Sequence, residues 1–254
     1  MPSRYNLLID IGNTFVKWGR YHVLGNGSEE ADRLETGHAL LEEMASLAVT
    51  WKALAAPHRV LISNVAGTRA RSTMLRVLEL WPDVDTHWLT AQPEQCGVRN
   101  GYRNPHQLGP DRWAAMIAAR SIADTRPVLV VVCGTATTLD FVSADGEFTG
   151  GCIMPGVGMM IRSLHEGTAA LPDATGNYAD HPKQTVDAIV SGCQHAQAGA
   201  IERIYRLHER SHSDLMCLLS GGGGKAIAPR LTIPFVPHDN LVLEGLHRIS
   251  GTLA

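Results

Sequence analysis

The chain has 254 residues and a formal net charge of −3; 44% of its residues are hydrophobic and 19% are charged. A chain of this length and composition can bury one or two hydrophobic cores. The small negative charge provides no basic surface for nucleic acid or for an anionic membrane, and apolar runs such as Val128–Cys133 are too short to cross a bilayer. We therefore expect neither a nucleic acid nor a membrane as a partner.

The cysteines give no sign of a disulfide framework or of a zinc site. They stand at positions 96, 133, 152, 193 and 217, with no C-x-x-C pair among them. Such scattered thiols are typical of a reduced cytosolic protein. The start, Met-Pro-Ser-Arg, leads directly into an expected strand and leaves no room for a signal peptide. We therefore expect a cytoplasmic protein.

The first distinctive stretch is residues 7–18, where an apolar strand runs into Asp10, a polar turn follows, and a second strand begins at Phe15. Gly12 lets the backbone approach a ligand closely, and the N–H groups of the turn, together with Thr14, can hold phosphate oxygens. Asp10, at the end of the strand, is placed to hold a hydrated Mg²⁺. From this stretch alone, an ordinary β-turn with a local side-chain hydrogen bond is an equal alternative.

The rest of the first half alternates strands with helices, which is typical of an open α/β sheet. Apolar spacing predicts a helix over 40–54, a strand over 59–65, a helix over 68–80 and a short strand at 87–89. A long connection over 93–112 then leads to an Ala-rich helix that ends near Ala123. Long irregular connections inside compact domains are usually functional.

Asp111 stands where this connection enters the Ala-rich helix, and two interpretations are open. It can be the N-cap of the helix, accepting a backbone N–H. It can also take a proton from a substrate hydroxyl at the mouth of a cleft. Without further context the N-cap is the better interpretation.

The second half opens with a repeat of the first hairpin. Residues 128–142 form an apolar strand, then Gly134 and Thr135, and then Thr137 and Thr138 leading into another strand. Two such copies indicate a duplicated fold. Two phosphate-holding hairpins that face each other across a cleft resemble the arrangement by which the actin-like fold of sugar kinases and Hsp70 holds ATP.

Further along, the spacing predicts helices near 159–164, over 185–210 and over 241–249, and a strand over 215–219. The strand enters the run Gly221–Gly224, followed by Lys225. This run is not a P-loop, because Leu219 and Ala226 stand where that motif needs a glycine and a hydroxyl. A flat adenine or ribose can still lie against the bare backbone, and a flexible surface turn is the alternative.

Taken together, these residues resemble the type III pantothenate kinases, a family that includes the Bvg accessory factors. The matching segments follow the family's order from residue 7 to residue 246. They are Asp10-x-Gly12-Asn13-Thr14, Tyr102 with Leu108-Gly109-x-Asp111-Arg112, Gly134-Thr135-Ala136-x-Thr138-x-Asp140, Gly150-Gly151-x-Ile153-x-Pro155-Gly156, Thr168-Ala169-x-Leu171-Pro172, Ser220-Gly221-Gly222 and Leu243-Glu244-Gly245-Leu246.

The resemblance implies an α/β protein with the duplicated actin-like ATPase fold. It implies two domains, 1–125 with the first phosphate motif and the pantothenate motif, and 126–254 with the second phosphate motif and the adenosine motif, and a nucleotide cleft between them. The implied activity is ATP-dependent phosphorylation of the 4′-hydroxyl of pantothenate, the first step of coenzyme A synthesis. The implied partners are ATP, pantothenate and a second copy of the chain.

The resemblance also implies a role for each site residue. Asp111 becomes the general base, and Asp10 positions Mg²⁺ through water. The ATP and phosphate site would consist of Asp10, Gly12, Asn13, Thr14, Lys17, Gly134, Thr135, Thr138, Gly221 and Gly222. The pantothenate pocket would consist of Tyr102, Gly109, Pro110, Asp111 and Arg112, with Thr168 reaching it from the neighbouring subunit.

One position departs from the family pattern. Many members carry an aspartate where this chain has Val132 and use it to bind K⁺ or NH₄⁺, and a valine offers no oxygen to such a cation. We therefore expect activity without a monovalent cation; weak binding of K⁺ through backbone carbonyls and Thr135 is the alternative. Two alternatives to the pantothenate kinase are a nucleotide-binding regulator of the same fold, against which the intact Asp10, Asp111 and Asp140 argue, and a kinase acting on another small molecule.

Overall fold

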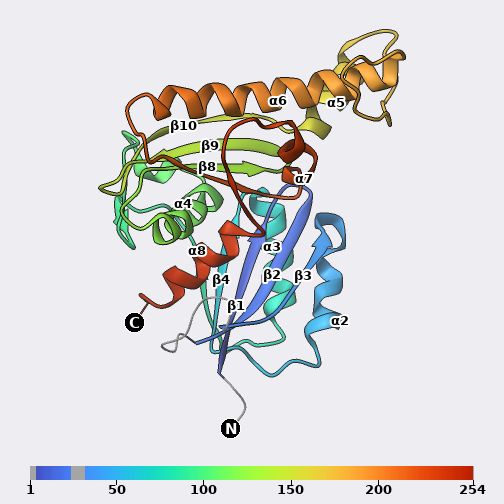
Figure 1. The fold of residues 1–254 in the computed structure, drawn as a ribbon. Helices are drawn as coiled ribbons and strands as arrows, with labels where there is room; N and C mark the ends of the chain where they lie inside the picture. The colour runs from blue at the N-terminus through green and yellow to red at the C-terminus, as the bar shows by residue number, and fades with distance from the viewer. Residues whose placement is uncertain (1–3, 24–31, 254) are drawn as a thin grey trace. The chain divides into compact units, whose positions relative to one another are not determined.

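The structure is a computed structural model that describes residues 4–23 and 32–253. The chain divides into two compact units, Met1–Ser121 with Leu241–Ala254, and Ile122–Asn240 (Figure 1). The junction after residue 121 lies near the expected boundary at 125/126, but residues 241–254 join the first unit instead of the second. The reason is that α8 (Leu241–Ser250) packs on β1.

The first unit is built on a five-stranded sheet in the order β3-β2-β1-β4-β5. Its strands are β1 (Tyr5–Ile11), β2 (Phe15–His22), β3 (Arg33–Leu40), β4 (Arg59–Asn64) and β5 (Asp85–Trp88). The central strand β1 is antiparallel to β2 and parallel to β4. This pairing brings the turn after β1 and the end of β4 to the same edge of the sheet.

Helices cover both faces of this sheet. On one face, η1 (Leu41–Ser46), α2 (Leu47–Trp51) and α3 (Gly67–Leu78) bury a core that includes Ile9, Trp51 and Met74. On the other face, α8 lies along β1 (Figure 1). The single helix expected over 40–54 is wrong, because the chain continues β3 to Leu40 and then forms two short helices.

The connection after β5 carries little regular structure before α4 (Pro110–Ala123). It contains the short strands β6 (Glu94–Gln95) and β7 (Val98–Asn100), which pair with each other, and the 3-10 turn η2 (Pro105–Gln107). Residues 112–119 of α4 are all buried, and so is Ala123, which explains the Ala-rich composition of this helix.

In the second unit the strands lie in the order β12-β11-β8-β9-β10. They are β8 (Val128–Cys133), β9 (Ala136–Val142), β10 (Glu147–Pro155), β11 (Met216–Ser220) and β12 (Val236–His238). The long helix α6 (Thr185–Glu209) packs on this sheet and shares a core with it, and α5 (Val157–Gly167) packs against α6 (Figure 1). Two short elements, α7 (Gly224–Ile227) and η3 (Ala228–Arg230), follow β11.

The two sheets repeat one topology. β8 is antiparallel to β9 and parallel to β11, as β1 is to β2 and β4. Within the first unit the strands follow β3-β2-β1-β4-β5 and within the second β10-β9-β8-β11-β12, the same connectivity twice. The duplicated fold predicted from the two hairpins is confirmed. Within the described ranges, no helix is long and apolar enough to cross a membrane.

Candidate active site

Asp10 lies at the carboxyl end of β1 with a polar neighbour on each side. It is paired with Lys17 of β2 and with Ser63 of β4. Directly paired residues on adjacent strands project from the same face of a sheet, so the three side chains share one face. Ile9 and Ile11 project from the other face into the core under α2 and α3.

The Asp10 carboxyl group is buried and electrostatically unsatisfied. Burial is the main reason why its pKa rises to about 7, the charge of Asp111 adds to the rise, and Lys17 and the Ser63 hydroxyl oppose it. Its Oδ1 atom has no hydrogen-bond partner among the described residues. A buried carboxylate oxygen in this state is stabilised by a cation, so the donor fits the hard, oxygen-seeking Mg²⁺.

The polar turn after β1 has the form that the sequence predicts. The N–H of Gly12 donates to the carbonyl oxygen of Phe15 at 3.0 Å, which closes the turn. Asn13 and Thr14 are exposed at its tip. In the residues that the structure describes, no group of three or more His, Cys, Asp or Glu side chains could hold a metal ion.

Asp111 lies inside the first turn of α4 and is not its N-cap. The helix begins at Pro110, and its first hydrogen bond runs from the Trp113 N–H to the Gly109 carbonyl at 3.0 Å, which makes Gly109 the N-cap. Asp111 Oδ1 instead accepts the backbone N–H of Arg112 at 2.8 Å. Burial raises the pKa of Asp111, while the N–H and the guanidinium of Arg112 lower it.

Gly109 leaves the space that the Asp111 carboxylate occupies. A Cβ atom added to Gly109 would lie 2.6 Å from Asp111 Oδ1, well inside van der Waals contact. Any larger residue at this position would therefore push the carboxylate aside.

Tyr102 and Arg112, two residues of the expected pantothenate motif, touch each other. Arg112 is 5% exposed, and its Nη1 donates to the Tyr102 hydroxyl at 3.0 Å. The guanidinium carbon lies 5.7 Å from the centre of the tyrosine ring. The structure thus gathers Tyr102, Gly109, Pro110, Asp111 and Arg112 at one end of α4.

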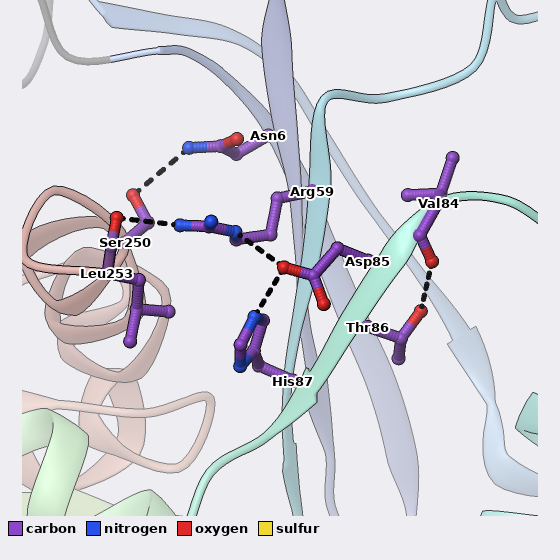
Figure 2. A network of polar contacts seen from close by, with 8 residues as sticks. All are labelled: Asn6, Arg59, Val84, Asp85, Thr86, His87, Ser250 and Leu253. Atoms are coloured by element: carbon purple, nitrogen blue, oxygen red, sulfur yellow. Dashed lines mark hydrogen bonds and ion pairs between the residues drawn. The ribbon is translucent and has the colours of Figure 1, made fainter.

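Helix α8 links the strand that carries Asp10 to the helix that carries Asp111. A Cβ on Gly245 would lie 1.8 Å from the carbonyl oxygen of Ala114, so the backbones of α8 and α4 are in direct contact. At the far end of β1, Asn6 donates to Ser250 of α8 at 3.2 Å, as Figure 2 shows.

Leu253, which follows α8, is also bonded to the first sheet at this end of β1. Arg59 of β4 donates to the carbonyl of Leu253 at 2.9 Å and to Asp85 of β5 at 3.2 Å (Figure 2). The carboxylate of Asp85 also lies 2.7 Å from the ring of His87. These contacts fasten α8 along the sheet.

The second hairpin repeats the geometry of the first with different side chains. Gly134 and Thr135 form the turn, and the Gly134 N–H donates to the Ala136 carbonyl at 3.0 Å. Thr138 already lies within β9, paired with Val132 of β8. Val132 therefore takes the place of Asp10 and Thr138 that of Lys17. Thr138 Oγ1 is buried and has no hydrogen-bond partner among the described residues.

Two glycines allow other segments to close around this turn. A Cβ on Gly156, just before α5, would lie 2.2 Å from the Gly134 carbonyl oxygen, and one on Gly221 would lie 2.3 Å from the Cys133 carbonyl oxygen. Gly221 also has a φ of +91°, which few other residues adopt. The loop with Gly221 and Gly222 thus meets the end of β8.

Thr168 follows the last turn of α5 and is exposed. Its hydroxyl donates to the Leu164 carbonyl at 2.8 Å and accepts the Leu171 N–H at 3.3 Å. In its own chain it therefore fixes the end of the helix.

Two features of the site escaped the sequence interpretation. Ser63 is identified only by the register of β4 on β1, and nothing in its local sequence distinguishes it from the end of any strand. Gly245 matched a family segment, but only the contact of α8 with α4 explains why a glycine is needed there.

Solved structures with a similar fold come from kinases and from other proteins. The chain superposes on a candidate 2-dehydro-3-deoxygalactonokinase from Sinorhizobium meliloti with a TM-score of 0.63, 14% identity and coverage of 98% of this chain and 99% of that one. A candidate transcriptional activator of the Baf family from Campylobacter jejuni gives a TM-score of 0.56, 18% identity and coverage of 96% of both chains. The fold is that of the actin-like ATPases and sugar kinases.

Sequence comparison identifies the family within this fold class. A family model for type III pantothenate kinase matches residues 6–207. A protein named type III pantothenate kinase from Dechloromonas aromatica is 45% identical over 243 residues, which are 95% of this chain and 97% of the relative. The chain belongs to the type III pantothenate kinase family.

Proposed function

We propose that this protein transfers the γ-phosphoryl group of ATP to the 4′-hydroxyl of pantothenate, the first step of coenzyme A biosynthesis. Family membership over nearly the whole chain supports this activity. The observation that carries the proposal is that the buried Asp10 and the partly buried Asp111, from separate elements of the first unit, lie near enough for the charge of Asp111 to raise the pKa of Asp10.

Asp111 is the proposed general base. Phosphoryl transfer asks a protein mainly to position the reactants, to offset charge and to orient the attacking group. A carboxylate whose pKa is raised by burial accepts a proton more readily than an exposed one. Tyr102, Gly109, Pro110 and Arg112, grouped around the start of α4, would shape the pantothenate pocket.

Asp10 is the proposed holder of the nucleotide's Mg²⁺, which would supply positive charge to the phosphate oxygens. Lys17, beside Asp10 on the same face of the sheet, would add a second positive charge. The phosphate groups would lie against the turns of the two hairpins, and the adenosine against the bare backbone of the Gly-rich loop. These contacts would come from Gly12, Asn13, Thr14, Gly134, Thr135, Thr138, Gly221 and Gly222.

We further propose that the protein acts in the cytoplasm as a homodimer. Thr168 of one subunit would then reach the pantothenate pocket of the other, so that each site would need both chains. Its exposed position after α5 leaves it accessible to a neighbouring chain. The family resemblance motivates this part of the proposal.

The test is release of ADP by the purified protein with MgATP, measured with and without pantothenate. We expect ADP release that depends on pantothenate and saturates with it. Release that responds only to a sugar acid would indicate a different kinase of this fold. Binding of ATP without release under any acceptor would indicate the regulatory alternative.

A further inference from the structure

Two polar atoms without partners lie side by side next to the proposed metal position. Ser63 is fully buried, at 0% exposure, and it is paired with Asp10 across the parallel strands β4 and β1. Neither Ser63 Oγ nor Asp10 Oδ1 has a hydrogen-bond partner among the described residues. The hydroxyl is near the carboxylate but makes no hydrogen bond of normal geometry with it.

A buried hydroxyl without a partner is costly, and most are satisfied. Ser63 follows the apolar Leu61 and Ile62 at the end of a buried strand, where an alanine would leave no oxygen unpaired. The hydroxyl shares its face of the sheet with Asp10 and Lys17. Its geometry therefore suits a role that depends on the carboxylate.

We propose that Ser63 is a positioning residue of the nucleotide site. In the nucleotide-bound protein its hydroxyl would donate to the Asp10 carboxylate and would fix the orientation in which that carboxylate faces the hydrated Mg²⁺ of the nucleotide. This inference shares one element with the proposed function, namely that the protein binds a nucleotide together with its metal ion. It places no demand on the identity of the acceptor.

Two substitutions of equal shape isolate the hydroxyl. Ser63→Thr keeps it and Ser63→Val replaces it with a methyl group, so any crowding in the strand is common to both. Ser63→Ala serves as a third variant that adds no volume. The matched control is Ser250→Ala, which removes another buried serine of the first unit, bonded to Asn6 at the opposite end of β1 (Figure 2).

The measurement is calorimetric binding of a non-hydrolysable ATP analogue, once with Mg²⁺ and once with EDTA. With Mg²⁺ we expect the affinity of Ser63→Thr for the analogue to be at least about tenfold higher than that of Ser63→Val, because a hydrogen bond to a charged group is involved. The affinity of wild type should exceed that of Ser63→Ala by a similar factor. With EDTA the members of each pair should bind equally. Ser250→Ala should lower the melting temperature and leave the ratio of the two affinities at the wild-type value.

The proposal would be overturned if the threonine and valine variants bound equally with Mg²⁺. It would also be overturned if their difference in affinity were as large with EDTA as with Mg²⁺. A change of the affinity ratio in Ser250→Ala as large as that in Ser63→Ala would overturn it as well, because the effect would then be a general loss of stability. No acceptor is present in this experiment. A protein that passes it but does not phosphorylate pantothenate would count against the proposed function alone.

Discussion

Gly109 leaves room for the carboxylate of its neighbour Asp111, the proposed general base. A Cβ at this position would lie 2.6 Å from Asp111 Oδ1. The residue before a proline is restricted to extended conformations, which alanine adopts without strain. Gly109→Ala should therefore fold normally but displace the carboxylate.

We expect Gly109→Ala to lower kcat by about tenfold to a hundredfold, since a catalytic group displaced by about 1 Å can cost that much. The KM for ATP and the melting temperature should stay close to the wild-type values. The control is Gly192→Ala in α6, where an added Cβ meets nothing within 4 Å. Steady-state kinetics of both variants decide the matter, and an unchanged kcat in Gly109→Ala would show that the carboxylate does not need this space.

Asp10 gives a pH-dependent prediction for the protein without metal and nucleotide. Its folded pKa of about 7 lies above the ordinary 3.8, so the folded state holds the proton more tightly than the unfolded chain. The stability from the neutral carboxyl is complete below about pH 4 and is lost as the pH rises through 7. Asp10→Asn keeps a neutral side chain at every pH.

Thermal melts should therefore show Asp10→Asn to be more stable than wild type at pH 8, with the difference shrinking toward pH 4.5. Asp85→Asn is the contrasting variant. The hydrogen bond from His87 is the main cause that lowers the pKa of this exposed carboxyl group. Removing the Asp85 carboxylate should therefore lower the stability slightly at pH 8. A difference between Asp10→Asn and wild type that does not change with pH would contradict the burial of an ionisable carboxyl group.

The sequence allowed Asp10 and Asp111 to be chosen, but not their full surroundings. Asp10 is recognisable because a charged residue ends an apolar strand. The expected N-cap role of Asp111 was wrong by two positions, because Pro110 starts the helix and Gly109 caps it. Ser63 could not be found, since its significance depends on strand register, which is a long-range property.

At the scale of elements, the sequence failed where a strand is exposed. The helix expected over 40–54 included Leu40, which in fact ends β3, paired with Phe15 of β2. Most side chains of β3 are exposed, so the strand lacks the buried alternation that would reveal it. Its pairing with β2 decides its conformation, and local spacing carries little of that information.

Helix α8 packs both on β1, which carries Asp10, and on α4, which carries Asp111, and Gly245 is its point of contact with α4. A Cβ there would lie 1.8 Å from the backbone oxygen of Ala114, which cannot move aside as a side chain could. Gly245→Ala should destabilise the protein by about 1–3 kcal/mol or more and should abolish most turnover, because α8 and α4 must separate.

The control for this prediction is Gly199→Ala in α6, an exposed helical position where the added Cβ meets nothing within 4 Å. That change should preserve stability or raise it by about 0.4–1 kcal/mol. Thermal melts and turnover of the two variants provide the comparison. Wild-type stability in Gly245→Ala would mean that the two helices are not in contact.

At the scale of the whole molecule, the repeat of one hairpin was enough to predict the duplicated fold. Residues 7–18 and 128–142 share a pattern of strand, glycine, polar turn and strand, and the five strands within each unit follow the same order. The return of residues 241–254 to the first unit was not predicted. An amphipathic helix at the end of a chain does not indicate which sheet it covers.

Val132 is where the repeat breaks. Its neighbours on the adjacent strands are Thr138 and Ser220, so hydroxyl groups flank a side chain that has no oxygen. We expect the same activity in sodium or Tris buffer as in KCl or NH₄Cl of equal ionic strength, because a hard cation binds poorly without oxygen ligands. Val132→Asp should introduce a dependence on K⁺ or NH₄⁺. A saturable, many-fold activation of the wild type by K⁺ but not by Na⁺ would contradict this expectation.

The proposed activity of this chain is phosphorylation of pantothenate with Asp111 as the base. The most direct test is to identify the product formed from MgATP and pantothenate, by mass spectrometry and phosphorus NMR, for wild type and for Asp111→Asn. The asparagine keeps an oxygen that can accept the Arg112 N–H. We predict 4′-phosphopantothenate from the wild type and at least about a hundredfold less from a folded Asp111→Asn. Product at similar rates from both proteins, or ATP hydrolysis with no phosphorylated pantothenate, would contradict the account.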